Sequence, residues 1–498
     1  MLLPCSKAQN PLLFDKYYNV GYVNSYNNNV IVLPDSTYLF SSYYNDSASS
    51  RLDHGLFKLD KYGNLLSKKL INYNNLPYLR PSTSYNNIVK ISNSSLMMVA
   101  TTIVNSKWAM IFSKLNAHTA DTVKTLLFCD SVNFYGVGNL MQIHPNKYFA
   151  IGNKEPQPYT QRWPVVIELD SNLTIVNTTN CNNPNNFITF FANYFSNQKI
   201  IIGGTVQLSN ILYPFIAEID TLGVIKKHVI MNDTIHGISQ VFYNSFNTSY
   251  YTIGGLRSSI YGNTNMYKIC VTKFDTALNM QWQKTYANAN YTTNAYDAVV
   301  NTDGSMVLVG RYSDSLYQPV KNVNTNAFML KINADGDSLW MRQFDNINDT
   351  THTFNTYLEA FWGIEKTPEG GYIMCGNAQQ QPKSQAWVVK TDSMGCVIGN
   401  CNNSTAGLVS SSAIENTFSI YPNPANERLN ISLSPFDSAQ GDKKEIKIIN
   451  VLGEVVSSSL VESTKHSSID ISHFYSGIYF ISVYNNKTLL GTKKIIKE

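Results

Sequence analysis

The chain has 498 residues, and its 38 Lys and Arg against 34 Asp and Glu give a formal net charge of +4. Charged residues make up only 14%, compared with about a quarter in typical soluble domains. Such a small excess, spread over a long chain, excludes the basic footprint of a nucleic-acid-binding protein. No apolar run reaches the about 20 residues of a transmembrane helix. The length favours one large domain and a smaller module.

Residues 1–8 are interpreted as the remnant of a secretory signal peptide. They place a small residue before Gln9, as a cleavage site does, but the basic start and the long apolar segment are missing. An ordinary cytosolic N-terminus is the alternative.

A repeat dominates residues 9–401. Each repeat contains a three-residue mark at the end of an apolar strand. The mark is usually a charged residue, then an apolar residue, then Asp or Asn. The marks recur 50 to 59 residues apart and end at Asp60, Asn116, Asp170, Asp220, Asp275, Asn333 and Asp392. An apolar run precedes each mark, and we expect the glycines that end five of these runs to let neighbouring backbones approach in a wedge-shaped stack of sheets. These glycines are Gly152, Gly203, Gly254, Gly310 and Gly376.

This period, with four short strands in each unit, predicts an all-β fold in which residues 9–401 form a seven-bladed β-propeller. Six or eight blades remain possible if a degenerate repeat is misread, and a series of unrelated β-sandwiches is the other class. Residues 12–19 match the fourth strand of a blade, yet no blade precedes them. We therefore expect residues 12–19 to pair as the outer strand of the last blade, which removes an exposed sheet edge.

The cysteines predict one disulfide. Cys396 and Cys401 lie five positions apart in a glycine-containing loop, which suits a bridge in an exported protein. Cys270 and Cys375 lie in apolar strands and are expected to be buried thiols.

Signatures of chemistry are absent from the sequence. No zinc-ligand spacing, hydrolase motif, phosphate loop or dinucleotide pattern occurs, so we expect no catalytic residue, metal or cofactor. The segment from Asn333 to Trp340 contains Asp335 and Asp337. We interpret this segment as a structural turn rather than as a weak cation site.

One face of the expected propeller collects the long loops. These are the second connections of the blades, at residues 41–55, 153–162, 257–266 and 312–325, and the links between blades. Binding residues usually lie on loops carried by a rigid scaffold, and aromatic rings beside amides suit sugars or peptides. The alternative is that the rings pack the loops together. The candidate ligand-binding residues are Tyr44, Tyr159, Arg162, Trp163, Arg257, Tyr261, Tyr291 and Tyr317.

Residues 402–416 form a Ser/Asn/Thr-rich linker, and residues 417–498 change character. Short alternating strands with Gly and Pro turns predict a small antiparallel Ig-like β-sandwich. Its motifs are Tyr421-Pro422-Asn423-Pro424-Ala425, Asn450-Val451-Leu452-Gly453, Ser476-Gly477-Ile478-Tyr479-Phe480 and Lys493-Lys494-Ile495-Ile496-Lys497.

The order and spacing of these four motifs resemble the type A C-terminal sorting domain of type IX secretion. The resemblance implies that the secretion machinery is a partner and that the protein is secreted or attached to the outer-membrane surface. An ordinary Ig-like adhesion module is the alternative. The upstream repeats also resemble propeller regions found before such domains. The sorting-motif residues are Tyr421, Pro422, Asn423, Pro424, Gly453, Gly477, Tyr479, Lys493 and Lys494.

The leading functional hypothesis is an exported, monomeric β-propeller that binds a glycan, peptide or protein without chemistry. The alternative is a secreted polysaccharide hydrolase or lyase, which needs two acids roughly 5–10 Å apart. Asp297 and Glu359 are the acids that the sequence offers near first strands. A structural spacer that displays the surface coat is a third possibility.

Overall fold

The computed structural model divides the chain into two compact units, residues Met1–Gly407 and Leu408–Glu498. Regular structure in the described part of the chain consists of strands, with no helix. The expected signal remnant (1–8) and linker (402–416) lie outside that part. The described residues are 12–18, 24–45, 52–71, 79–81, 87–156, 163–181, 187–196, 199–208, 211–220, 224–231, 236–257, 266–291, 293–312, 326–344, 359–380, 383–397, 418–433, 443–450, 455–462, 467–485 and 488–498.

The strands of the first unit follow one another as antiparallel meanders, which we number as groups 1 to 7. Group 1 is β2 (Asn24–Val32), β3 (Tyr38–Asn45), β4 (Leu52–Leu59) and β5 (Leu65–Ile71). Group 2 is β6 (Leu79–Pro81), β7 (Ile88–Ser92), β8 (Ser95–Val104), β9 (Lys107–Asn116) and β10 (Thr122–Phe128). Group 3 is β11 (Phe134–His144), β12 (Lys147–Glu155), β13 (Trp163–Leu169) and β14 (Ile175–Asn180).

The later groups repeat the same order. Group 4 is β15 (Phe187–Ser196), β16 (Lys199–Leu208), β17 (Ile211–Ile219) and β18 (Ile225–Ile230). Group 5 is β19 (His236–Asn244), β20 (Ser249–Arg257), β21 (Met266–Phe274) and β22 (Met280–Tyr291). Group 6 is β23 (Asn294–Val300), β24 (Met306–Tyr312), β25 (Asn326–Ile332) and β26 (Ser338–Phe344). Group 7 is β27 (Ala360–Lys366), β28 (Tyr372–Gln380) and β29 (Lys383–Thr391).

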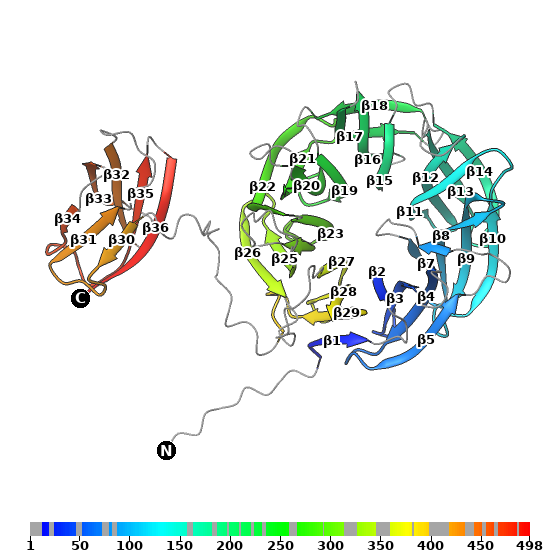
Figure 1. Cartoon of the computed structure of the whole chain (residues 1–498), viewed down its shortest axis with the longest axis horizontal. Helices are drawn as coiled ribbons and strands as arrows, with labels where there is room; N and C mark the ends of the chain where they lie inside the picture. The colour runs from blue at the N-terminus through cyan, green and yellow to red at the C-terminus, as the bar shows by residue number, and fades with distance from the viewer. Residues whose placement is uncertain are drawn as a thin grey trace, which may run out of the picture. The chain divides into compact units, whose positions relative to one another are not determined.

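The groups stand side by side around a ring, with the first strand of each on the inside and the last on the outside (Figure 1). The hydrophobic cores lie between neighbouring groups. One core joins Leu39 and Leu56 of group 1 to Leu96 and Met98 of group 2, and comparable cores follow around the ring. Burying both faces of every sheet in this way is the arrangement of a β-propeller.

The first strand of the chain lies on the last group. β1 (Phe14–Tyr18) pairs antiparallel with β29, with Phe14 opposite Lys390 and Tyr18 opposite Ala386. A core shared by the first and last groups includes Phe14, Tyr18 and Phe57. A single parallel pair, Asn24 with Ser384, also joins β2 to β29, so groups 7 and 1 count as one eight-stranded sheet.

The repeated Asp or Asn caps the third turn of its group. In group 1, Asp60 Oδ1 accepts hydrogen bonds from the backbone N–H groups of Tyr62 (2.9 Å) and Asn64 (2.8 Å). The same pattern holds at Asp170, Asp275, Asn333 and Asp392. The side chain therefore closes the turn itself. The Asn333 segment forms a turn, as expected.

Two details of the loops differ from the sequence-based expectation. Residues 41–55 are not one long loop, because β3 runs to Asn45 and Tyr44 pairs with Asp53 on β4. The second connection of group 2 is a tight turn at Asn105 and Ser106, both at positive φ. Ser41, Ser42, Tyr43 and Tyr44 continue the β3 ladder, so the run of polar residues did not mark the strand's end.

The second unit contains two sheets that share one core. One has the order β30 (Phe418–Tyr421), β31 (Arg428–Leu433) and β34 (Ser467–Asp470). The other has the order β33 (Val455–Glu462), β32 (Lys443–Asn450), β35 (Gly477–Asn485) and β36 (Thr488–Lys497). Both contribute to the core, which includes Leu429, Ile431, Ile446, Ile448, Ile481, Val483 and Ile495.

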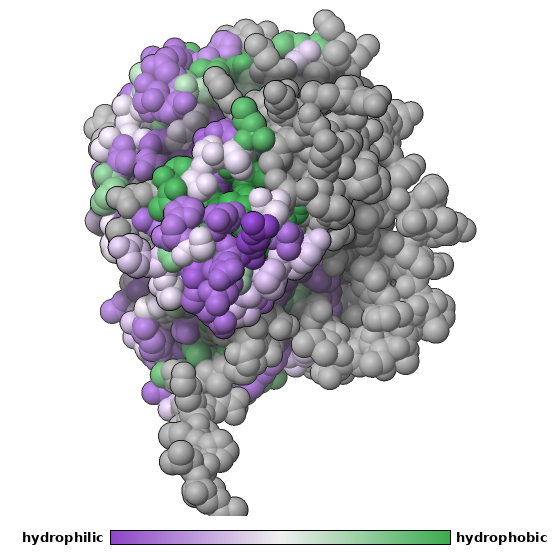
Figure 2. Space-filling view, turned by 90° about the vertical axis from the view of Figure 1, so that its left-hand side faces the viewer, coloured by the Kyte–Doolittle hydropathy of each residue, from purple (hydrophilic) through white to green (hydrophobic). Residues whose placement is uncertain are grey.

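The described surface mixes polar and apolar residues. Figure 2 shows hydrophobic residues interrupting hydrophilic ones on the side that faces the viewer. Among the residues that the structure describes, none forms a helix long and apolar enough to span a bilayer.

Candidate functional site

The inner strands of the ring share one irregularity. In β2, β11, β15, β19, β23 and β27 the register with the second strand shifts by one residue. Such a β-bulge leaves an extra residue unpaired and redirects its side chain. β15 contains two such shifts, and the extra residues of groups 4 to 7 are Ile188, Phe191, Ser239, Tyr296 and Trp362.

The glycines of the repeat belong to these bulges. A Cβ on Gly152, Gly310 or Gly376 would lie 2.2, 2.0 or 1.8 Å from a carbonyl oxygen of the inner strand of the same sheet. Gly310 and Gly376 pair with the residue immediately before the bulge. The close approach of the backbones therefore lies within each sheet and not, as expected from the sequence, between sheets of the stack.

Two bulges bring aromatic rings together at the boundary of groups 6 and 7. The rings of Tyr296 and Trp362 stack with centroids 4.3 Å apart and an interplanar angle of 26°. The Arg311 guanidinium lies 5.7 Å from the centroid of Tyr296, and Trp362 Nε1 donates a 2.5 Å hydrogen bond to Asn377 Oδ1. We call Tyr296, Trp362, Arg311 and Asn377 the bulge cluster.

The bulge cluster combines a buried and an accessible part. Tyr296 is buried, and burial raises the pKa of its hydroxyl to about 12. Trp362 and Arg311 are half-buried, so part of each side chain reaches solvent. A flat aromatic surface beside a guanidinium can stack on a ligand ring and donate hydrogen bonds to it, while the buried Asn377 fixes the indole.

Buried polar groups lie next to the bulge cluster. Asp297 follows Tyr296, and its carboxylate accepts hydrogen bonds from the backbone N–H groups of Ala298 (2.9 Å) and Ile364 (3.1 Å). Burial raises its pKa well above the ordinary range. Asn139 of group 3 donates a 3.3 Å hydrogen bond to Gln240 of group 5, and both side chains are buried.

The two acids offered by the sequence are inaccessible. Asp297 is 7% exposed and Glu359 is 5% exposed, so neither carboxylate is presented to a substrate. A third acid on the same strands, Glu365, does reach solvent. Desolvation by the surrounding protein raises the pKa of Glu365 to about 7. The sequence gives no sign of this shift, because desolvation of the carboxyl depends on how the folded protein surrounds it.

Most predicted ligand residues lie outside the described side chains. Tyr159, Arg162, Tyr261 and Tyr317 lie outside the described residues, and Tyr44, Arg257 and Tyr291 are placed only as strand positions on β3, β20 and β22. Trp163 begins β13, pairs with Lys154 and is half-buried. The bulge cluster contains none of the predicted ligand residues. An aromatic residue near the start of an inner strand is the signal that could have indicated it.

The cysteines are partly as expected. Cys396 is disulfide-bonded, while Cys401 lies outside the described residues, so their pairing stays a prediction. Cys270 and Cys375 are buried free thiols, as their apolar strands indicate. In the described part of the chain, no three acidic, His or Cys side chains gather as metal ligands.

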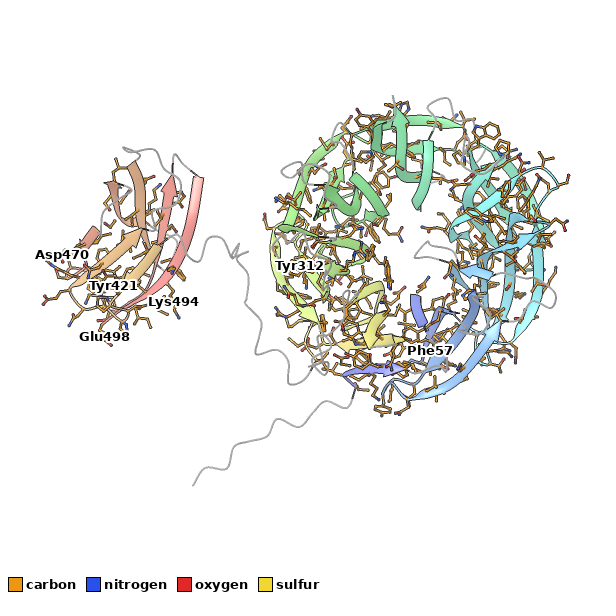
Figure 3. The ribbon with its side chains drawn as sticks, viewed as in Figure 1. Phe57, Tyr312, Tyr421, Asp470, Lys494 and Glu498 are labelled. Atoms are coloured by element: carbon orange, nitrogen blue, oxygen red, sulfur yellow. The ribbon has the colours of Figure 1, made fainter. Side chains whose placement is uncertain are left out.

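In the second unit, two separate sequence motifs meet. Asn423 Nδ2 donates a hydrogen bond to the carbonyl of Lys494 (3.0 Å), and its Oδ1 accepts one from the N–H of Ile496 (2.9 Å). The Ala425 N–H adds a 2.8 Å bond to the Ile496 carbonyl. Tyr421, Lys494 and Glu498 lie at the same end of this unit (Figure 3). The Pro-rich loop thus fastens the edge strand β36, whereas Gly453 lies outside the described residues.

A family model for the secretion system C-terminal sorting domain matches residues 419–498. These residues form a C-terminal sorting domain. The sorting domain marks proteins that type IX secretion exports to the cell surface or the extracellular space. The predicted resemblance is confirmed.

Solved structures resemble the rest of the chain in fold. A virginiamycin B lyase from Staphylococcus aureus has a TM-score of 0.41 at 6% identity and covers 76% of this chain and 99% of its own. The β-propeller domain of the Trilobed protease from Pyrococcus furiosus has a TM-score of 0.39 at 8% identity, with 76% and 96% covered. An α-L-arabinofuranosidase from Fusarium graminearum has a TM-score of 0.38 at 10% identity, with 75% and 94% covered. Likenesses at this level say nothing of activity. No curated protein sequence matches the chain.

Proposed function

We propose that the exported chain is a seven-bladed β-propeller, closed by β1, that binds a glycan at the bulge cluster without chemistry. The seven strand groups are its blades, and the core shared by groups 7 and 1 supports closure. The sorting domain is an Ig-like sandwich that engages the type IX machinery.

The observation that carries this proposal is the half-buried Trp362, held by its stack on Tyr296 and its hydrogen bond to Asn377. A ring fixed in this way loses little conformational freedom when a sugar ring stacks on it. The half-buried Arg311 supplies a polar group beside the ring, and an aromatic surface with a polar group next to it can fix a hydroxylated ligand; the buried Asn377 holds the indole in place.

The accessibility of the acids favours binding over hydrolysis. Glycoside hydrolysis requires two carboxyl groups that both reach the scissile bond. Asp297 instead accepts two backbone hydrogen bonds inside the protein, and Glu359 is equally buried. Glu365 alone does not make such a pair.

The test is a glycan-array screen of the purified full chain, followed by calorimetric titration and an assay for released reducing ends. We expect binding without turnover, and Trp362→Ala weakens it at least tenfold. Phe246→Ala is the matched control, because Phe246 is an aromatic residue 63% exposed in the β19–β20 turn. Binding unaffected by Trp362→Ala contradicts the site. Release of reducing ends from a polysaccharide supports the hydrolase or lyase alternative.

A further inference from the structure

The sorting domain exposes large apolar side chains on one face of its four-stranded sheet. Val455 pairs with Ile449, and Ile449 pairs with Phe480, so these residues form one row across three strands. Ile478 pairs with Ile496 beside that row. Directly opposed side chains on one face lie about 4.5–5.5 Å apart between Cβ atoms, so the five residues are contiguous. We call them the outer apolar face.

The outer apolar face is turned away from the core. Its neighbours in sequence, Ile448, Ile481 and Ile495, are fully buried between the two sheets. Val455 is 53% exposed, Ile478 42%, Ile496 39% and Phe480 36%. Large apolar residues gathered in register on a small domain mark an interaction surface.

Two observations indicate what covers this face. First, it lies within the residues that match the sorting-domain family, on β35 and β36, where the sequence analysis expects the sorting motifs at Gly477, Tyr479 and Lys494. Second, the exposed Lys494 pairs with Phe480, so a cation stands in the apolar row. The hydrogen bonds from Asn423 hold the Lys494 and Ile496 backbone in place, which fixes the face before any partner arrives.

We propose, on the basis of the machinery engagement proposed above, that the outer apolar face is the surface through which the export machinery recognises the sorting domain. The partner is a protein of that machinery that presents an apolar patch with a carboxylate opposite Lys494. Burial of the apolar row supplies the affinity, and the Lys494 charge orients the encounter.

The test follows export of the full chain in a strain that carries type IX secretion. Phe480→Glu and, separately, Ile496→Glu place a carboxylate in the apolar row. We expect each to lower the fraction that reaches the medium or cell surface at least tenfold, with the protein accumulating in the periplasm. Leu460→Glu is the matched control, because Leu460 is 68% exposed on β33 of the same sheet but lies outside the outer apolar face. We expect that variant to be exported normally.

A folding defect is separated from a recognition defect by limited proteolysis of the periplasmic protein. If Phe480→Glu is protease-sensitive, the milder Phe480→Thr, a good strand former, replaces it. Normal export of folded Phe480 and Ile496 variants overturns the proposal, and so does an equal block by Leu460→Glu. Sedimentation of the purified chain tests a second copy as the occupant. A concentration-dependent dimer abolished by Phe480→Glu assigns the face to self-association and also overturns the proposal.

Discussion

The indole N–H of Trp387 donates a 2.7 Å hydrogen bond to the Asp15 carboxylate, joining residues 372 positions apart. Trp387 is fully buried in the last group, and its ring also stacks on Tyr17 with centroids 5.7 Å apart. The Tyr18 hydroxyl donates to the Gly63 carbonyl at 2.7 Å. The first strand of the chain therefore contacts both the last and the first group of the ring.

Replacing Asp15 tests this junction. We expect Asp15→Ala to lower the free energy of unfolding by about 1–3 kcal/mol, because the buried indole N–H loses its acceptor. Asp15→Asn keeps an acceptor oxygen and costs less. Urea denaturation measures both, and deletion of residues 9–20 lowers the melting temperature further. An unchanged melt after that deletion contradicts closure by β1.

The bulge glycines give a second prediction. A Cβ on Gly376 meets the Ala360 carbonyl oxygen at 1.8 Å, so Gly376→Ala forces the backbone apart and destabilises the protein by about 1–3 kcal/mol. Gly136 has no atom within 4 Å of the added Cβ, which makes Gly136→Ala the matched control. Thermal unfolding distinguishes them, and equal melts for the two variants argue against the bulge geometry.

Glu365 makes stability depend on pH. Its folded-state pKa of about 7 lies above the roughly 4.3 of an unfolded Glu. The folded state therefore holds the proton more tightly, and its stability falls as the pH rises from about 4 to 7. We expect Glu365→Gln to have the same melting temperature as the wild type at pH 4 and a higher melting temperature at pH 8. A constant difference at both pH values contradicts this assignment.

Glu369 is a control whose effect on stability depends on pH in the opposite direction. Burial raises its pKa, but a backbone hydrogen bond and the Lys390 ammonium 3.4 Å away outweigh burial and leave the pKa below its ordinary value. Glu369→Gln should therefore melt below the wild type at pH 8, with the difference shrinking as the pH falls below 4.

Asn423 gives a prediction within the sorting domain. Asn423→Ala removes both hydrogen bonds to β36, so the Ile496 amide should exchange its hydrogen at least tenfold faster. The Ile446 amide, on the inner strand β32, is the internal control. Hydrogen exchange followed by mass spectrometry measures both. Unchanged exchange at Ile496 would show that the Ala425 contacts and the ladder with β35 hold the strand without Asn423.

The sequence was sufficient for the repeat because its marks are local. Asp60 and its equivalents close their own turns, so their spacing reports the period directly. The motifs of the sorting domain could likewise be recognised in the sequence. The contact between two of them through Asn423 could not be predicted.

The sequence marks the rings of the bulge cluster only as aromatic residues near the start of inner strands, because a bulge is a property of two strands. Trp362 follows Phe361 in a sequence that is typical of an ordinary inner strand, and only the register of β27 with β28 places Trp362 in a bulge. Its contact with Tyr296 depends further on the packing of two neighbouring groups. The elevated pKa of Glu365 has the same non-local origin.

The pairing of β1 with β29 also sets an order of events. During synthesis, β1 leaves the ribosome long before β29 exists, and it stays without its ladder partner until nearly the whole ring has been made. The sorting domain follows β29 along the chain. By the time the sorting domain has been synthesised, every strand that the ring needs has already been translated.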